Sequence, residues 1–97
     1  MTKWLQSGRR RDLCVLLYNA ETLRGQSLKT RLEAHYDTHI DSQSFYAALR
    51  SLEEKGFVEK RTEGIHEAYA LTDAGERRVE EHFEWMREKI ERESSPE

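Results

Sequence analysis

The sequence predicts a mostly helical α+β domain with three short helices, a β-hairpin and one long final helix. Three observations predict this fold class. Apolar residues recur at helical spacing in the first half of the chain, residues 57–71 read as two strands around Gly64, and an apolar seam of heptad spacing runs through residues 73–92. Two helices joined by a short turn and followed by a hairpin make a winged helix-turn-helix, which we place at residues 9–72.

Length and charge limit the classes of function. Ninety-seven residues suffice for one domain with a thin core, which a second subunit would enlarge. Residues 1–66 carry a net charge of +2 and residues 67–97 a net charge of −5, a division that the overall −3 conceals. The chain has no apolar run long enough for a membrane span and no signal-like start, so we expect a soluble, cytoplasmic protein.

Residues 9–20 form the first predicted helix, after an N-terminal arm of residues 1–8. Its apolar stripe, which includes Leu13 and Leu17, is widened by neighbouring apolar residues to most of the circumference. A helix that is apolar nearly all round is covered on more than one side. In so small a domain we expect the second cover to be another subunit, so we place Leu13 and Leu17 at a dimer interface.

The helix-turn-helix is predicted from a helix over residues 26–36 and a second helix that begins at Asp41 or Ser42. Either residue offers a side-chain oxygen that can cap the start of the second helix. Gly56 is expected to end that helix in a left-handed conformation. Its buried stripe follows the i, i+3, i+4, i+7 spacing and consists of Phe45, Ala48, Leu49 and Leu52.

The opposite face of this helix is the candidate DNA-reading surface. At about 100° per residue, Gln43 and Arg50 point away from the buried stripe, whereas Ser44 and Tyr46 lie on its flanks. Arginine can pair with guanine and glutamine with adenine, while serine and tyrosine hydroxyls suit phosphates. The plainer alternative is a solvated helix face, but the hairpin that follows favours DNA contact.

Further cations are candidates for phosphate contacts. The expected hairpin strands, residues 57–61 and 67–71, carry Lys60 and Arg61. Arg10 and Lys29 could add non-specific attraction, although the arginine triplet at residues 9–11 reads equally well as a solvated helix start. The complete candidate DNA-binding set is Gln43, Ser44, Tyr46, Arg50, Lys60, Arg61, Arg10 and Lys29.

Residues 73–92 predict a long dimerisation helix, followed by a flexible tail of residues 93–97. The helix is expected to be capped by Thr72 or Asp73. Its apolar positions are spaced 4, 3, 4, which is a narrow heptad seam rather than a broad core stripe. A narrow seam on a protruding helix usually meets a partner helix, so we expect a homodimer through Val79, Phe83, Met86 and Ile90.

Trp4 and Trp85 have two interpretations. Flat aromatic side chains in a dimer cleft could bind a small planar effector, and the plainer alternative is that they pack the dimer interface.

No catalytic or metal-binding pattern emerges from the sequence. It has no Gly-rich phosphate loop and no Ser/His/Asp context, so we expect no enzyme and no cofactor. His35, Asp37, His39 and Asp41 alternate like metal ligands, but three of them lie in a turn with no cysteine nearby. We therefore interpret these four residues as a polar loop and expect no metal.

The segments SQSFYAALRSLEEKGFVEKR and AYALTDAGE resemble the PadR family of winged-helix transcription regulators. That family carries a Leu-Tyr-Pro-x-Leu-x-x-Leu-Glu-x-x-Gly-Leu-Val run and then a Tyr-x-Leu-Thr-x-x-Gly run. The resemblance covers about residues 9–90. It implies a dimeric repressor of the compact subgroup, whose single C-terminal helix crosses to the other subunit. The matching residues are Phe45-Tyr46-Ala47, Leu49, Leu52, Glu53, Gly56, Phe57, Val58, Tyr69, Leu71, Thr72 and Gly75.

Two departures from the family pattern affect the expected site. Ala47 stands where the family has proline, which loosens the start of its helix. The wing turn at residues 62–67, often rich in Arg and Pro in the family, carries two acids here. We therefore expect Lys60 and Arg61, rather than the tip, to contact phosphates.

The expected function is a sequence-specific DNA-binding regulator that acts as a homodimeric repressor on a roughly palindromic, double-stranded operator. The alternative is a winged-helix protein–protein interaction module that does not read DNA. The acidic wing and the negative net charge favour the alternative, whereas the outward face with Gln43 and Arg50 and the basic first half favour DNA.

Overall fold

The computed structural model describes residues 8–94, and their side chains as far as residue 91. Residues 1–7 of the expected arm, Trp4 among them, and residues 95–97 of the expected tail lie outside this description. The elements, in chain order, are α1 (Gly8–Tyr18), β1 (Leu23–Arg24), α2 (Gly25–Tyr36), α3 (Ser42–Glu54), β2 (Val58–Glu63), β3 (His66–Leu71) and α4 (Asp73–Ser94).

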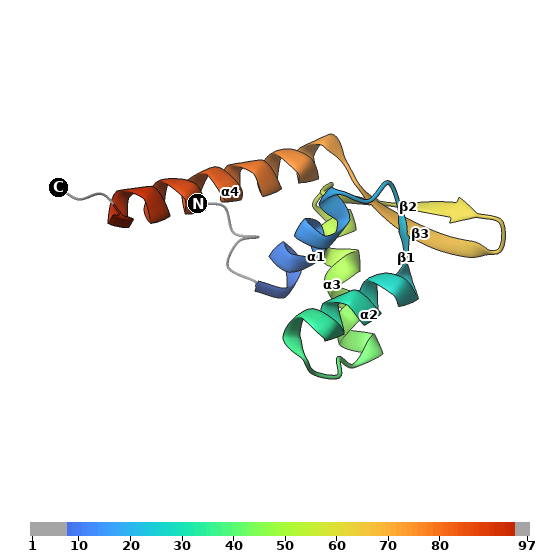
Figure 1. The fold of residues 1–97 in the computed structure, drawn as a ribbon. Coiled ribbons are helices and arrows are strands. Elements are labelled where there is room, and N and C mark those ends of the chain that lie inside the picture. Colours follow the sequence, from blue (N-terminus) through green and yellow to red (C-terminus); the bar gives the residue numbers. More distant parts are fainter. Residues whose placement is uncertain (1–7, 95–97) are drawn as a thin grey trace.

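Three short helices form a head from which two elements project. Figure 1 shows the β2–β3 hairpin leaving the head on one side and α4 leaving it on the opposite side. The expected order of three helices, hairpin and long helix is therefore confirmed. Helix α4 continues to Ser94, so residues 93 and 94 belong to the helix rather than to the tail. Among the described residues, no helix is both long and apolar enough to cross a membrane.

The sheet has one strand that the sequence did not reveal. Its order is β1-β3-β2 and both pairings are antiparallel, with Val58 opposite Leu71 and Leu23 opposite Tyr69. Strand β1 has two residues, which is too short to show the alternation that marks a strand in a sequence. Its pairing joins the base of the hairpin to the segment just before α2.

The core lies between the three short helices and β3, and it corrects one assignment. Leu13 and Leu17 are both 0% exposed within the single chain. Helices α2, α3 and α4 and strand β3 all pack against α1, so the wide apolar stripe is covered by the protein's own elements. The prediction that Leu13 and Leu17 lie at a dimer interface is wrong. The exposed apolar residue of α1 is Val15.

The expected helix and turn signals have the expected geometry. Asp41 Oδ2 accepts a hydrogen bond of 3.0 Å from the backbone N–H of Ser44 and so caps α3. Gly56, after the end of α3, and Gly64, in the hairpin turn, have positive φ values of 81° and 63°. Thr72 Oγ1 accepts a hydrogen bond of 3.1 Å from Gly75 N, which makes Thr72 the cap of α4.

The start of α4 is tied to the base of the hairpin. The backbone N–H of Thr72 donates to the carbonyl oxygen of Phe57 at 3.1 Å, and the Thr72 hydroxyl donates to the carbonyl oxygen of Gly56 at 2.6 Å. A Cβ at Gly75 would lie closer to the Phe57 carbonyl oxygen than real Cβ atoms approach such an atom. Glycine at position 75 therefore lets α4 begin directly against the hairpin.

Candidate nucleic-acid interface

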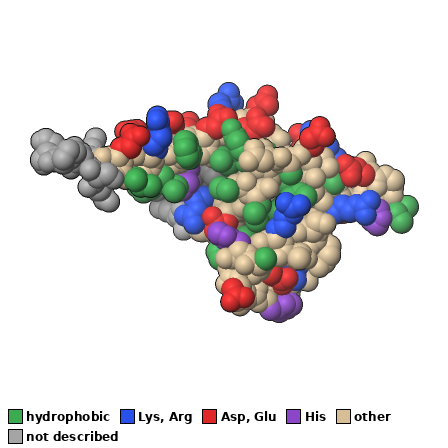
Figure 2. Space-filling view, viewed as in Figure 1, with side chains coloured by type: hydrophobic (Ala, Val, Ile, Leu, Met, Phe, Trp, Pro, Cys, Tyr) green, Lys and Arg blue, Asp and Glu red, His purple; other side chains and the backbone are tan. Residues whose placement is uncertain are grey.

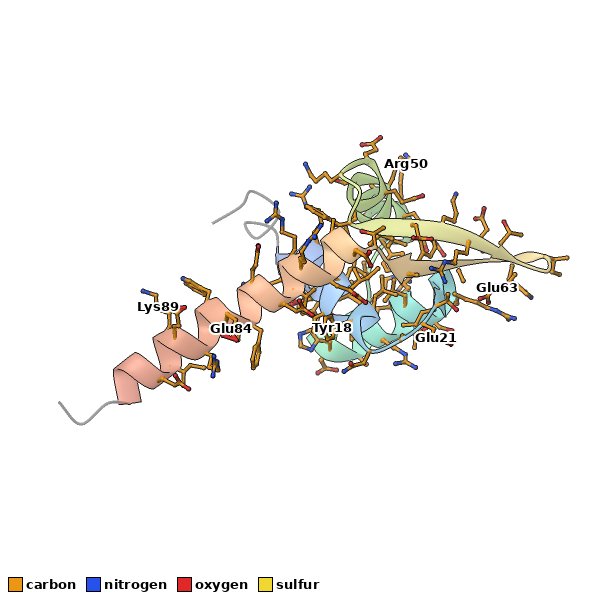
Figure 3. The ribbon with its side chains drawn as sticks, turned by 90° about the horizontal axis from the view of Figure 1, so that it is seen from above. Tyr18, Glu21, Arg50, Glu63, Glu84 and Lys89 are labelled. Carbon is orange, nitrogen blue, oxygen red and sulfur yellow. The ribbon has the colours of Figure 1, made fainter. Side chains whose placement is uncertain are left out.

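Helix α3 presents a polar outer face above a buried stripe. Phe45, Leu49 and Leu52 are each at most 1% exposed and hold the helix in the core. Gln43 and Arg50 are exposed on the other side, and Figure 3 shows Arg50 projecting from the body of the protein. Exposed amide and guanidinium groups on one helix face have the donors and acceptors needed to read base edges.

Ser44 and Tyr46 differ in their surroundings. Ser44 is exposed in the first turn of α3, whereas Tyr46 is half-buried. The Tyr46 ring packs edge-to-face against the Phe45 ring, with their centroids 4.9 Å apart. A Cβ added at Gly25 would lie 2.6 Å from the Tyr46 hydroxyl oxygen, so the tyrosine packs closely against the backbone of Gly25. Tyr46 therefore joins α3 to the start of α2. It also lines an open hollow of about 690 Å³ between α2 and the hairpin, together with Arg24, Gln26, Ser27 and His66.

Lys29 is not available as a phosphate contact. Its side chain is 6% exposed, and its Nζ lies 2.9 Å from Glu33 Oε2. Moving this ammonium group to a phosphate would break a well-shielded ion pair, so the expectation for Lys29 is corrected. The sequence alone suggests a surface cation at this position, because a single lysine carries no sign of its burial.

Glu33 holds the turn of the helix-turn-helix, a role that the sequence did not reveal. Its Oε2 accepts from the backbone N–H of Ile40 at 2.9 Å and from Lys29, and it lies 3.2 Å from His39 Nδ1. The hydrogen bond from Ile40, followed by that from Lys29, lowers the pKa of the Glu33 carboxyl. The Lys29–Glu33 spacing of four residues was a signal for part of this cluster.

Arg10 connects two helices of the head. Its Nη1 donates a hydrogen bond of 2.9 Å to Ser51 Oγ, which brings the start of α1 to the second half of α3. The side chain is half-buried, so part of its guanidinium is occupied by protein. A phosphate contact by Arg10 stays a prediction.

The hairpin cations are exposed but paired with hairpin acids. Lys60 Nζ lies 3.5 Å from Glu67 Oε2, and Arg61 Nε lies 3.0 Å from Glu59 Oε2. Glu63 accepts a hydrogen bond of 2.9 Å from Thr22 Oγ1, which ties the hairpin to the segment before β1. Lys60 and Arg61 must exchange these carboxylates for phosphates before they contribute to DNA affinity.

The alternating loop residues have other partners in the structure. His39 lies beside Glu33, Asp41 caps α3, and His35 Nε2 lies 3.7 Å from Asp12 Oδ2. No group of three potential ligands is arranged for a metal ion within the described part of the chain.

A second exposed surface lies where α1 and α4 meet. Phe83, Met86 and Ile90 are 59%, 40% and 58% exposed, whereas Val79 is half-buried against the core. In Figure 2, hydrophobic side chains lie along the projecting helix, and acidic side chains gather along its upper edge. This arrangement fits the expected narrow seam.

Trp85 borders an open groove of about 480 Å³ on one side of the seam. Its ring stacks on His82 with centroids 5.8 Å apart, and burial together with nearby Arg11 lowers the pKa of His82. Trp4 lies outside the described residues. A planar effector at this groove stays a prediction.

Comparisons with known proteins agree with this geometry. The sequence matches the transcriptional regulator PadR-like family over residues 13–81, which is more than half of the chain. RosR from H. salinarum is 28% identical with a TM-score of 0.80, and the match covers 86% of this chain and 76% of that one. A comparison with curated proteins gave no match.

Two more distant structures share the fold. The homodimeric winged helix-turn-helix DNA-binding domain Mb0332 from Mycobacterium bovis is 22% identical with a TM-score of 0.77, covering 98% of this chain and 82% of that one. MepR, a transcription regulator of a Staphylococcus aureus multidrug efflux pump, is 18% identical with a TM-score of 0.73, and the match covers 93% of this chain and 67% of that one. The fold is therefore a winged helix-turn-helix, and the chain belongs to the PadR-like family of transcriptional regulators.

Proposed function

We propose that this chain is a cytoplasmic homodimeric repressor that binds a roughly palindromic operator. Helix α3 of each subunit enters the major groove, and Arg50 and Gln43 read base edges there. The exposed polar face of α3, held in place by its buried stripe, is the observation that carries the proposal. The description of Mb0332 as a homodimeric DNA-binding domain adds support. Two such helices about one helical turn apart would match a two-fold operator.

Arg50 is the best single test of base reading. Arg50→Ala should lose about 1–3 kcal/mol of affinity for the operator and little on random DNA, because a bidentate guanine contact carries the specificity. Electrophoretic mobility shift assays measure both affinities, with the gene's own upstream region as the operator and a scrambled duplex as the random DNA. Arg77→Ala, an equally charged and exposed change on α4, should leave both affinities unchanged. Equal losses on both duplexes would make Arg50 a phosphate contact.

A protein–protein interaction module is the second candidate, and one observation favours it. The hairpin tip carries Ile65, which is 94% exposed, between Glu63 and Glu67. An apolar side chain flanked by acids suits a basic protein surface better than a phosphate backbone. If the wild-type chain fails to shift any duplex from its own upstream region at low salt, the interaction module replaces the repressor.

A further inference from the structure

The turn between α2 and α3 is closed by one carboxylate. Glu33 lies in the last turn of α2, and its Oε2 accepts a hydrogen bond of 2.9 Å from the backbone N–H of Ile40, seven residues further along the chain. Between these two residues, Asp37 ends α2 with a left-handed φ of 54°. The hydrogen bond therefore spans the turn and joins the end of α2 to the residue just before Asp41, the cap of α3.

Two buried groups keep this connection in place. Lys29 Nζ lies 2.9 Å from the same Glu33 oxygen, and the Lys29 side chain is 6% exposed. A buried ammonium group is costly without its carboxylate, so Glu33 stays directed at the turn. The Ile40 side chain, which is 2% exposed, packs into the core at the other end of the hydrogen bond. The residue that precedes the cap of α3 is thus fixed both by a hydrogen bond and by packing.

The first turn of α3 depends on this connection more than the rest of the helix does. Residues 42–44 are exposed, and the buried stripe that anchors α3 in the core begins at Phe45. Gln43 follows Ile40 by three residues, whereas Arg50 lies roughly 10 Å further along the helix at 1.5 Å per residue. A displacement of Ile40 therefore moves Gln43, while Arg50 stays where the core holds it.

We propose that Glu33 is a positioning residue for base reading: it sets the first turn of α3 so that Gln43 meets a base edge, and it does not contact DNA itself. The inference rests on the DNA-binding function proposed above. A hydrogen-bonding side chain reads a base when it is held within about 0.5 Å of the productive geometry. Loss of the hydrogen bond between Glu33 and Ile40 would release the first turn from that geometry.

Two substitutions separate the hydrogen bond of Glu33 from its charge. Glu33→Gln removes the charge and keeps a side-chain oxygen at the same reach, so the bond from Ile40 can persist. Glu33→Asp keeps the charge and withdraws the oxygen by one methylene, so the bond is lost. A carboxylate that acted by charge would repel any phosphate backbone, so Glu33→Gln would tighten binding to every duplex and Glu33→Asp would change nothing. Positioning predicts instead that Glu33→Asp weakens binding to the operator alone.

Mobility shift assays with the operator and a scrambled duplex measure these affinities. Glu33→Asp should weaken operator binding about tenfold, the loss expected for one base contact, and leave the affinity for the scrambled duplex unchanged. Glu33→Gln should bind the operator within about threefold of the wild type. Glu54→Asp, the same change at an exposed position on α3, is the matched control and should leave both affinities unchanged. Circular dichroism at the assay temperature gives the folded fraction, by which each affinity is corrected.

A double-mutant cycle locates the effect on α3. Glu33→Asp added to Gln43→Ala should cost less than about twofold in operator affinity, because the contact that it disturbs is already absent. Glu33→Asp added to Arg50→Ala should again cost about tenfold, because the two substitutions act on different contacts. A variant that acted by lowering the folded fraction would cost the same in both backgrounds.

The failures of this inference and of the proposed function are distinguishable. If Glu33→Asp binds the operator like the wild type, or loses affinity equally for both duplexes, the positioning role is overturned and Arg50→Ala still tests the proposed DNA reading. Equal costs in the Gln43→Ala and Arg50→Ala backgrounds would also overturn the positioning role. A wild-type chain with no preference for the operator would overturn the proposed function and this inference together.

Discussion

The helix-turn-helix and the outer half of α4 differ in how completely a single chain pairs their polar groups and buries their apolar side chains. In the helix-turn-helix, Asp41 caps α3, Glu33 accepts hydrogen bonds from Lys29 and Ile40, and the apolar stripe is buried. In the outer half of α4, the apolar side chains of Phe83, Met86 and Ile90 are 40–59% exposed. The helix-turn-helix is therefore fully packed and capped within one subunit, whereas α4 has an apolar surface suited to a second subunit.

The largest expected effect comes from placing charge in the seam of α4. Phe83→Glu combined with Met86→Glu should produce a monomer, because carboxylates would have to be buried without partners. Sedimentation measures the association state, and circular dichroism should show a helical head. Leu at position 83 is the control, since it keeps the seam apolar and should stay dimeric. A dimer of the double-glutamate variant would place the interface elsewhere.

The next largest effect concerns Glu33 in the turn of the helix-turn-helix, whose contribution to stability should depend on pH. Because the folded pKa of Glu33 lies below its ordinary value of 4.5, its contribution to stability is present above that value. That contribution is lost as the pH falls through the folded pKa. Glu33→Gln should therefore have a lower Tm than the wild type at neutral pH, and the two melting temperatures should converge as the pH falls from 4.5 through the folded pKa.

Thermal melts across a pH series would measure this convergence. Glu54→Gln, at an exposed position on α3, is the control and should melt like the wild type throughout the series. A constant difference between wild type and Glu33→Gln at every pH would mean that the loss is steric and not linked to ionisation of this carboxyl.

The smallest expected effect is on the salt dependence of operator binding, for which charges on the hairpin are compared with charges on α4. Neutralising Lys60 and Arg61 together should make the slope of log affinity against log salt concentration less steep. Each phosphate contact contributes about −0.9 to that slope, and we expect a change smaller than that of two contacts. The loss is partial because both cations already have carboxylate partners. Neutralising Glu88 and Glu91 should leave the slope unchanged at 0.1 M salt, where the Debye length is about 10 Å. A flat wild-type dependence would count against DNA binding.

The same contrast explains what could be predicted from the sequence. Caps and turns are local, so Asp41, Gly56 and Thr72 could be assigned from their chemistry. The buried stripe of α3 and the seam of α4 could be assigned from their periods. The fold class follows from these features together, because each element is marked within its own residues.

What the sequence could not show is which neighbour covers each residue. Leu13 and Leu17 belong to a stripe that is apolar nearly all round, and periodicity does not distinguish the protein's own core from a partner. Lys29 was misplaced for a related reason, because the burial of a lysine depends on the elements packed around it and not on its residue type. The ion pair between Lys60 and Glu67 also depends on the strand register, which sets Lys60 opposite Tyr69 and Thr62 opposite Glu67.

The contact between Gly75 and Phe57 has a consequence for the spacing of an operator. Since the first turn of α4 is held against the base of the hairpin, the helix and the head share one orientation. In a dimer joined through α4, the angle at which the two helices cross sets the separation of the two α3 helices. A change of a few degrees at that crossing would move both heads along the duplex axis. The number of base pairs between half-sites is therefore expected to depend on residues in α4 that never approach DNA.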